Sequence, residues 1–154
     1  MNYYDATICL NGHVQSDSMA RSEKYCSQCG KETFSECTNC GAPIRGQEKP
    51  GGYIASRTDY KKPFYCYKCG EPYPWTSLII NNAVELASLD DIGEENKKLI
   101  KDALPDLIVE SPMTPLAVAK YQKGLSKAGS FVKDALRQLL IDVVCEMAKK
   151  QLFQ

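Results

Sequence analysis

The chain has 154 residues and no formal net charge, because 19 Lys and Arg residues balance 19 Asp and Glu residues. Its length allows one domain or two small ones. No apolar run approaches the ~20 residues that a membrane-spanning helix needs, and no secretory signal is visible at the start. We therefore expect a cytoplasmic protein, without the basic surplus that binding to double-stranded nucleic acid usually requires.

The first segment predicts a β-hairpin. Residues 3–10 are typical of a strand, Asn11-Gly12 of a tight turn, and residues 13–15 of a returning strand. Asn-Gly is the strongest short hairpin signal, because both residues accept a positive φ. Such a turn swings His13 back beside Cys9.

Three knuckles of the form Cys-x-x-Cys-Gly follow, at residues 26–30, 37–41 and 66–70. Each directs two thiolates at one metal ion, and its glycine can take a positive φ and bring its N–H close to a sulfur. With the hairpin pair, the candidate ligands are Cys9, His13, Cys26, Cys29, Cys37, Cys40, Cys66 and Cys69. These eight donors fill two tetrahedral sites.

Zinc suits this donor set best, because it prefers thiolates with an occasional imidazole. Disulfides compete for any cysteine-rich chain, but without an oxidising compartment regular Cys-x-x-Cys pairs favour metal. Iron–sulfur ligation is a minor alternative, since neither common ferredoxin spacing is present. The sequence therefore predicts two zinc ions per chain.

His13 is the least certain ligand by residue type. Three cysteine pairs leave two positions vacant, and Cys9 with His13 is the only other paired set of donors. Asp5 and Asp17 are weaker substitutes. We therefore predict that His13 is a ligand.

The partnering of the four pairs is open to two arrangements. In the nested one, Cys26, Cys29, Cys37 and Cys40 form one site, and Cys9, His13, Cys66 and Cys69 close an outer one. In the interleaved one, the first pair joins the third and the second joins the fourth. The short link between the first and second knuckles favours nesting, although loop entropy grows only slowly with length.

Composition changes near Trp75, which divides the chain into residues 1–75 and 76–154. The first part is rich in cysteine, glycine and tyrosine, so metal must substitute for a large apolar core. Residues 51–62 read as a long loop or a β-hairpin, and residues 71–75 as a stiff strut with two prolines. Trp75 is expected to pack between the zinc module and the helices.

About four helices are expected in the second part. The first covers residues 76–89, and the second runs from a cap at Asp90 or Asp91 to about Leu104, where Pro105 ends or kinks it. Thr114-Pro115 opens the third as an N-cap followed by proline. The fold class is therefore α+β: an N-terminal double zinc-ribbon module with short β-hairpins, followed by a small helical bundle.

The last helix, about residues 130–153, has a broad apolar face. Its members are Phe131, Val132, Ala135, Leu136, Leu139, Leu140, Val143, Val144 and Met147, extended by Ile141, Cys145 and Ala148. So wide a face either lies at the centre of the bundle or is buried against another chain. Cys145, remote from the other cysteines, is expected to be a small buried hydrophobe.

Several motifs together are more specific than any single knuckle: residues 8–14, 25–30, 42–46, 65–70, 72–75, 105–110, 114–117 and 136–138. On these motifs the chain resembles an uncharacterised bacterial family, domain of unknown function 2321, over nearly its whole length. The resemblance implies a bacterial cytoplasmic zinc-ribbon protein and agrees with His13 as a ligand. It implies no activity.

The sequence leaves three classes of function to compare. An enzyme is disfavoured, because two filled sites leave no open metal position and no histidine for acid–base work. A regulatory protein that binds nucleic acid would use Arg45, Lys61, Lys62, Lys68 and the tyrosines, but thiolate-bound zinc lowers the net charge to about −3. We therefore expect a non-catalytic interaction or assembly module that binds other protein chains, including its own through the last helix.

Overall fold

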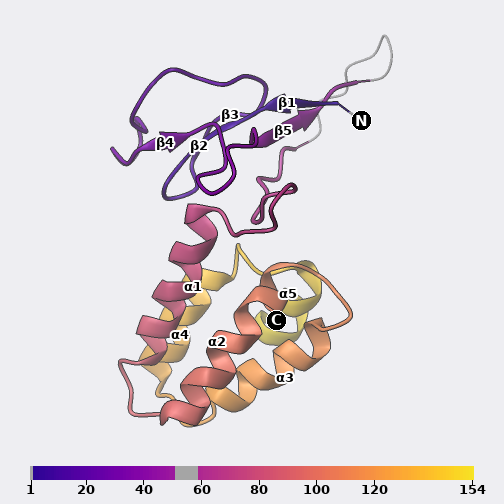
Figure 1. The fold of residues 1–154 in the computed structure, drawn as a ribbon. Helices are drawn as coiled ribbons and strands as arrows, with labels where there is room; N and C mark the ends of the chain where they lie inside the picture. The colour runs from indigo at the N-terminus through magenta and orange to yellow at the C-terminus, as the bar shows by residue number, and fades with distance from the viewer. Residues whose placement is uncertain (1, 51–58) are drawn as a thin grey trace. The chain divides into compact units, whose positions relative to one another are not determined.

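The computed structural model describes residues 2–50 and 59–154 and divides the chain into two compact units, Met1–Leu78 and Ile79–Gln154 (Figure 1). The predicted class is confirmed, since short antiparallel strands occupy the first unit and helices the second. The predicted loop or hairpin at residues 51–62 falls largely outside the described residues. Within the described ranges, no helix is long and apolar enough to cross a membrane.

In the described part of the first unit, five short strands form two small sheets. β1 (Tyr3–Asp5) pairs with β5 (Arg45–Glu48), whereas β2 (Thr7–Cys9) lies between β3 (Val14–Ser16) and β4 (Thr33–Phe34). All these pairings are antiparallel.

The predicted strand at residues 3–10 is therefore broken in two, and the break lies at Ala6. Ala6 is fully buried, and its amide donates to the carbonyl of Ile44 at 2.9 Å. This bond lets β1 and β2 join different sheets. The predicted hairpin across Asn11-Gly12 is confirmed: β2 pairs with β3, and Gly12 has a φ of +90°.

The first unit has a small apolar cluster. Its buried members are Ala6, Ile8, Cys37, Ala42, Ile44, Cys66, Tyr73 and Trp75. Tyr73 stacks on Trp75 with ring centroids 4.8 Å apart. Trp75 belongs to this cluster, and the indole Nε1 donates to the carbonyl of Pro63 at 3.0 Å. Two cysteines and two aromatic rings thus provide much of the core.

The second unit consists of helices packed around one core. The helices are α1 (Pro74–Ala87), which begins in the first unit, α2 (Glu94–Ile108), α3 (Thr114–Gly124), α4 (Ser130–Leu140) and α5 (Glu146–Phe153). Proline at the first position of α1 and near the start of α3 costs no intrahelical hydrogen bond. The strut predicted at residues 71–75 is thus partly helical.

Pro105 was expected to end or kink α2, and it does not end the helix. The helix continues to Ile108 because Leu107 and Ile108 are buried in the core. Pro105 itself is exposed, so the carbonyl one turn earlier, which loses its amide partner, can bind water. The expected cap is also different: Gly93 precedes the helix, and Asp90 accepts a hydrogen bond from the amide of Gly129 at 2.7 Å.

The predicted last helix is two helices. After Leu140 the chain turns, and the amide of Cys145 donates to the carbonyl of Leu107 at 2.8 Å, outside any helical pattern. The apolar face runs across the break: Val132, Leu136, Leu140, Val144 and Ala148 are all buried in the core of this unit. Cys145 is partly buried and packs against that core.

Candidate metal centres

The eight predicted ligands gather in two clusters of four, each with its ligand atoms within 4.8 Å of one another. The first centre consists of Cys9, His13, Cys26 and Cys29, and the second of Cys37, Cys40, Cys66 and Cys69. Neither Asp5 nor Asp17 belongs to a cluster among the described residues. Both clusters have the composition of a four-coordinate metal site.

The predicted nested partnering is wrong, and so is the interleaved alternative: the structure joins consecutive pairs. The reason is β4, which lies in the link between the first and second knuckles and pairs with β2. This pairing places Thr33 opposite Cys9 and brings the knuckle before β4 beside the hairpin. Loop closure favoured nesting by only a small term, which the strand pairing outweighs.

The three knuckles share one backbone arrangement. The amide of the first cysteine donates to the residue after the glycine, at 2.8 Å for Cys26 to Lys31, 2.7 Å for Cys37 to Ala42 and 2.9 Å for Cys66 to Glu71. Each glycine has a positive φ, between +73° and +78°. This conformation explains why glycine ends every knuckle.

The sequence led us to expect that the glycine amide of each knuckle lies close to a sulfur, but its hydrogen bond goes to a carbonyl instead. In each knuckle it donates to the carbonyl of the first cysteine, at 2.8 or 2.9 Å. In two knuckles an amide two residues after that cysteine donates to its sulfur: the amide of Gln28 is 3.3 Å from Cys26 Sγ, and that of Lys68 is 3.4 Å from Cys66 Sγ. These bonds stabilise the thiolate form that binds metal.

The distances between ligand atoms suit a metal ion and rule out disulfides among these residues. Sulfur–sulfur distances are 3.7 Å for Cys9 and Cys29, 3.8 Å for Cys37 and Cys69, and 3.7 Å for Cys40 and Cys66. A disulfide bond is about 2.05 Å long. A tetrahedral ion with metal–sulfur bonds of about 2.3 Å requires sulfurs about 3.8 Å apart.

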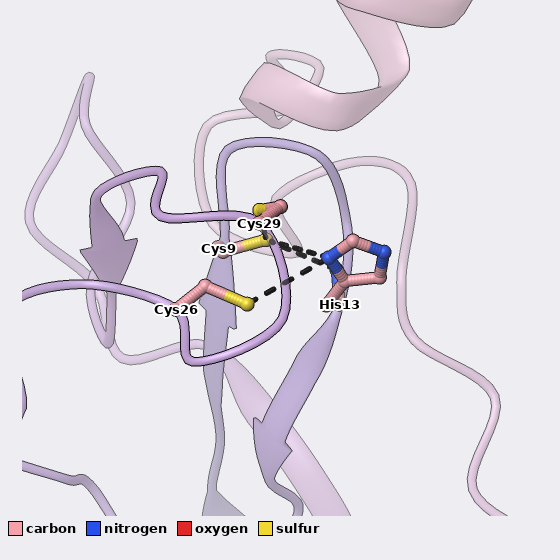
Figure 2. A group of neighbouring side chains, drawn as sticks. All are labelled: Cys9, His13, Cys26 and Cys29. Atoms are coloured by element: carbon pink, nitrogen blue, oxygen red, sulfur yellow. Dashed lines mark hydrogen bonds between the residues drawn. The ribbon is translucent and has the colours of Figure 1, made fainter.

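The histidine completes the first centre through Nδ1. This atom lies 3.5 Å from Cys9 Sγ and 3.7 Å from Cys26 Sγ, and Figure 2 shows the imidazole turned toward the sulfurs. Metal–nitrogen bonds of about 2.0 Å with metal–sulfur bonds of about 2.3 Å give a nitrogen–sulfur separation of about 3.5 Å. His13 therefore occupies a ligand position.

The surroundings of the ligands shift cysteine pKa values in opposite directions, as one cysteine from each centre shows. Burial raises the pKa of Cys26, but N–H donors, led by that of Gln28, and the ring of His13 outweigh it and lower the pKa to about 6. The amide of Ala42 lowers the pKa of Cys40, but desolvation and the neighbouring cysteines raise it to about 11. Four thiolates cannot ionise together without a cation, so metal binding releases protons.

Two residues near the first centre, Gln15 and Lys62, were not associated with it from the sequence. Gln15 donates from Nε2 to Cys26 Sγ at 3.2 Å and to the carbonyl of His13 at 3.0 Å. Gln15 lies in β3 two residues after His13, and this spacing, at which side chains of an extended chain point the same way, was the available signal. Lys62 donates to the carbonyl of Gly12 at 2.9 Å and had no signal, because it lies far along the chain.

Comparison with known protein families shows which family the chain belongs to. A family model described as an uncharacterised protein conserved in bacteria (DUF2321) covers residues 2–152. The chain belongs to this family. No curated protein and no solved structure matches it. DUF2321 membership thus agrees with the resemblance found in the sequence, and any activity has to be argued from the centres and surfaces.

The first test of the centres is metal content. We expect two metal ions per chain after purification without chelator, because each cluster offers four protein ligands at tetrahedral spacing. Replacing Cys29 with Ser should remove the first ion, and replacing Cys69 with Ser the second. Elemental analysis with native mass spectrometry measures both. One ion or none in the wild type would contradict the prediction.

Proposed function

We propose that this DUF2321 protein is a non-catalytic, zinc-binding interaction module, in which two structural zinc ions fold the first unit and the helical unit binds another protein. Zinc fits the three-cysteine, one-histidine and four-cysteine sets better than harder or redox-active metals do. With four protein ligands apiece, both centres are closed in the manner of structural sites, and the only histidine lies within one of them.

A groove between α1 and α4 carries the proposal of protein binding. Its volume is about 350 Å³, and its lining comprises Asn82, Glu85, Leu86, Leu89 and Leu139. Leu89 is 65% exposed, and Phe131, in the first turn of α4, is 75% exposed. The bond from the amide of Gly129 to Asp90 holds that turn close to the end of α1. Phe131 is not a lining residue but follows Gly129 by two positions, and we use the name α1–α4 groove for the lining residues together with Phe131.

This surface differs from the one expected from sequence. Leu136 and Leu140 of that expected surface are fully buried in the core of the helical unit. Phe131 lies on the exposed side of the same helix. Large exposed side chains beside a hollow apolar groove are typical of a protein-binding surface.

Charge selects the kind of partner. Glu85 is the charged residue of the lining, and Asp90 lies at the end of the groove. A second copy of the chain would bring acidic groups against acidic groups, which is unfavourable. We therefore propose an amphipathic helix of another protein as the occupant, with apolar residues toward Leu89 and Phe131 and basic residues along its flanks.

The test combines capture with groove variants. We expect Leu89→Glu with Phe131→Glu to weaken binding of the native partner at least about tenfold, because two exposed apolar anchors are lost. Leu116→Glu is the matched control, since Leu116 is 47% exposed on α3. The control should retain the partner, and both variants should keep their helical content and metal.

A photo-cross-linking amino acid at position 131 then identifies what lies in the groove. Cross-links to a helix of one other protein are expected. Cross-links to a second copy of the chain would replace the partner with a homodimer. Unchanged binding by the groove variant would reject the surface.

A second function is favoured by a different observation in the first unit. The guanidinium of Arg45 lies 3.9 Å from the ring centroid of Tyr67 and 4.5 Å from that of Tyr3, and Lys49 lies 5.3 Å from the ring of Tyr4. Exposed cations beside aromatic rings suit single-stranded nucleic acid. Fluorescence anisotropy with labelled single strands distinguishes the two functions. Tight binding that weakens steeply with salt would favour nucleic acid.

A further inference from the structure

Lys62 lies over the ligand loop of the first centre. Its side chain is half-buried, and Nζ donates to the carbonyl of Gly12, 2.9 Å away. Lys61 next to it is exposed. The sequence named the two lysines together as residues that a nucleic-acid-binding protein would use, whereas the structure gives them different environments.

Gly12 is an integral part of the metal-binding loop. Its amide donates to the carbonyl of Cys9 at 2.9 Å, and the amide of His13 donates to Cys9 Sγ at 3.3 Å. A Cβ at position 12 would lie 2.8 Å from Lys62 Nζ and 3.2 Å from Trp75 Cβ. The ammonium group therefore packs directly on the backbone that joins the two ligands.

The segment that carries Lys62 is fixed in place. Trp75 Nε1 donates to the carbonyl of Pro63 at 3.0 Å, and Thr76 Oγ1 donates to that of Phe64 at 2.7 Å. Trp75 and Thr76 are both fully buried. Since two side chains hold the residues that follow Lys62, its position over the loop costs little further ordering of the backbone.

The charge of Lys62 complements that of the first centre. Burial lowers the pKa of Lys62, and the thiolate of Cys9 acts in the opposite direction. A divalent ion with three thiolates and an imidazole carries a charge of about −1, which one ammonium group balances. The four-thiolate second centre carries about −2. In the second centre, the backbone amide of Lys68, a neutral group, donates to Cys66 Sγ. Another ligand of that centre, Cys40, is exposed.

We propose that Lys62 is the positioning and charge-compensating residue of the first centre, so that the first centre retains its metal when the second releases it. This inference rests on the proposed metal binding of both clusters. Its functional meaning is that the two centres are not equivalent. The first centre holds its metal more tightly, and the second centre, with exposed Cys40, loses its metal first. Outer-sphere partners of this kind typically change metal affinity 10- to 100-fold.

The experiment follows each centre separately in protein loaded with cadmium-113. Each centre gives its own NMR resonance, and the four-thiolate resonance lies downfield of the one with an imidazole ligand. During titration with EDTA, we expect the four-thiolate resonance of the wild type to disappear first. In Lys62→Met, the resonance of the first centre should disappear at an EDTA concentration at least about tenfold lower than in the wild type. Lys61→Met should match the wild type.

Lys62→Arg keeps the charge and separates its role from packing. Retention of the first centre's affinity in this variant, with loss in Lys62→Met, is the expected pattern. If Lys62→Met releases cadmium in the same order and at the same EDTA concentrations as the wild type, the inference is overturned. If Lys62→Met does not fold, Lys62→Arg decides the question. Charge compensation is rejected when the first centre of Lys62→Arg no longer keeps its cadmium longer than the second centre does. A wild type that binds no metal would instead reject the proposed function.

Discussion

Removal of metal should unfold the first unit, residues 2–78, while the helical unit keeps most of its helical signal. The apolar cluster of the first unit is small and includes the ligands Cys37 and Cys66. Structural zinc contributes on the order of 10 kcal/mol to small metal-binding modules, which exceeds what so small a core can replace. The helical unit has its own core, centred on Leu104, Leu107 and Leu136.

Hydrogen exchange by mass spectrometry, with and without EDTA, measures this result segment by segment. Peptides from β2, β4 and the knuckles should lose protection on chelation, and peptides from α2 and α4 should retain it. The beginning of α1 should lose its helical structure with the first unit, because Trp75 is buried there. Far-ultraviolet circular dichroism should fall only slightly. Complete loss of helical signal would show that the two units unfold as one.

The ligands were predictable from sequence, but their partnering was not. Cysteine spacing and the Asn-Gly turn identify which side chains can bind metal, because both depend on neighbours a few residues apart. Partnering depends on which strand lies beside β2, and β4 is only two residues long. So short a strand has no visible alternation of apolar and polar residues. The contact of Lys62 with Gly12 was also invisible in the sequence, because it joins residues far apart in the chain.

The helices show a similar division. Periodicity located α1 closely, and the Thr114-Pro115 start signal located α3. Periodicity ran through the break after Leu140, because the apolar positions continue on the other side. The break depends on a tertiary hydrogen bond, from the amide of Cys145 to the carbonyl of Leu107. Burial likewise decided that α2 continues past Pro105, against local propensity. In both cases contacts with distant residues outweighed the local pattern.

The same core determines the outcome of substitutions on α4. Leu136 is fully buried, and Phe131 is 75% exposed on the same helix. Replacing Leu136 with Ala should destabilise the helical unit by about 2–5 kcal/mol, through lost burial and the cavity left behind. Leu136→Asp adds an unpaired buried charge, which is enough to unfold a unit of this size. Phe131→Asp should change stability by less than about 0.5 kcal/mol, because the side chain already lies in solvent.

Thermal unfolding of the three variants, together with metal content, tests this order. Leu136→Asp should lose most of its helical signal and keep both metal ions, since its damage lies in the second unit. Leu136→Ala should remain folded with a lower Tm, and Phe131→Asp should match the wild type in both measurements. A Leu136→Asp protein that stays folded and only changes its oligomeric state would mean that this side chain lies at an interface between chains. That result would restore the last-helix surface suggested by the sequence and displace the α1–α4 groove.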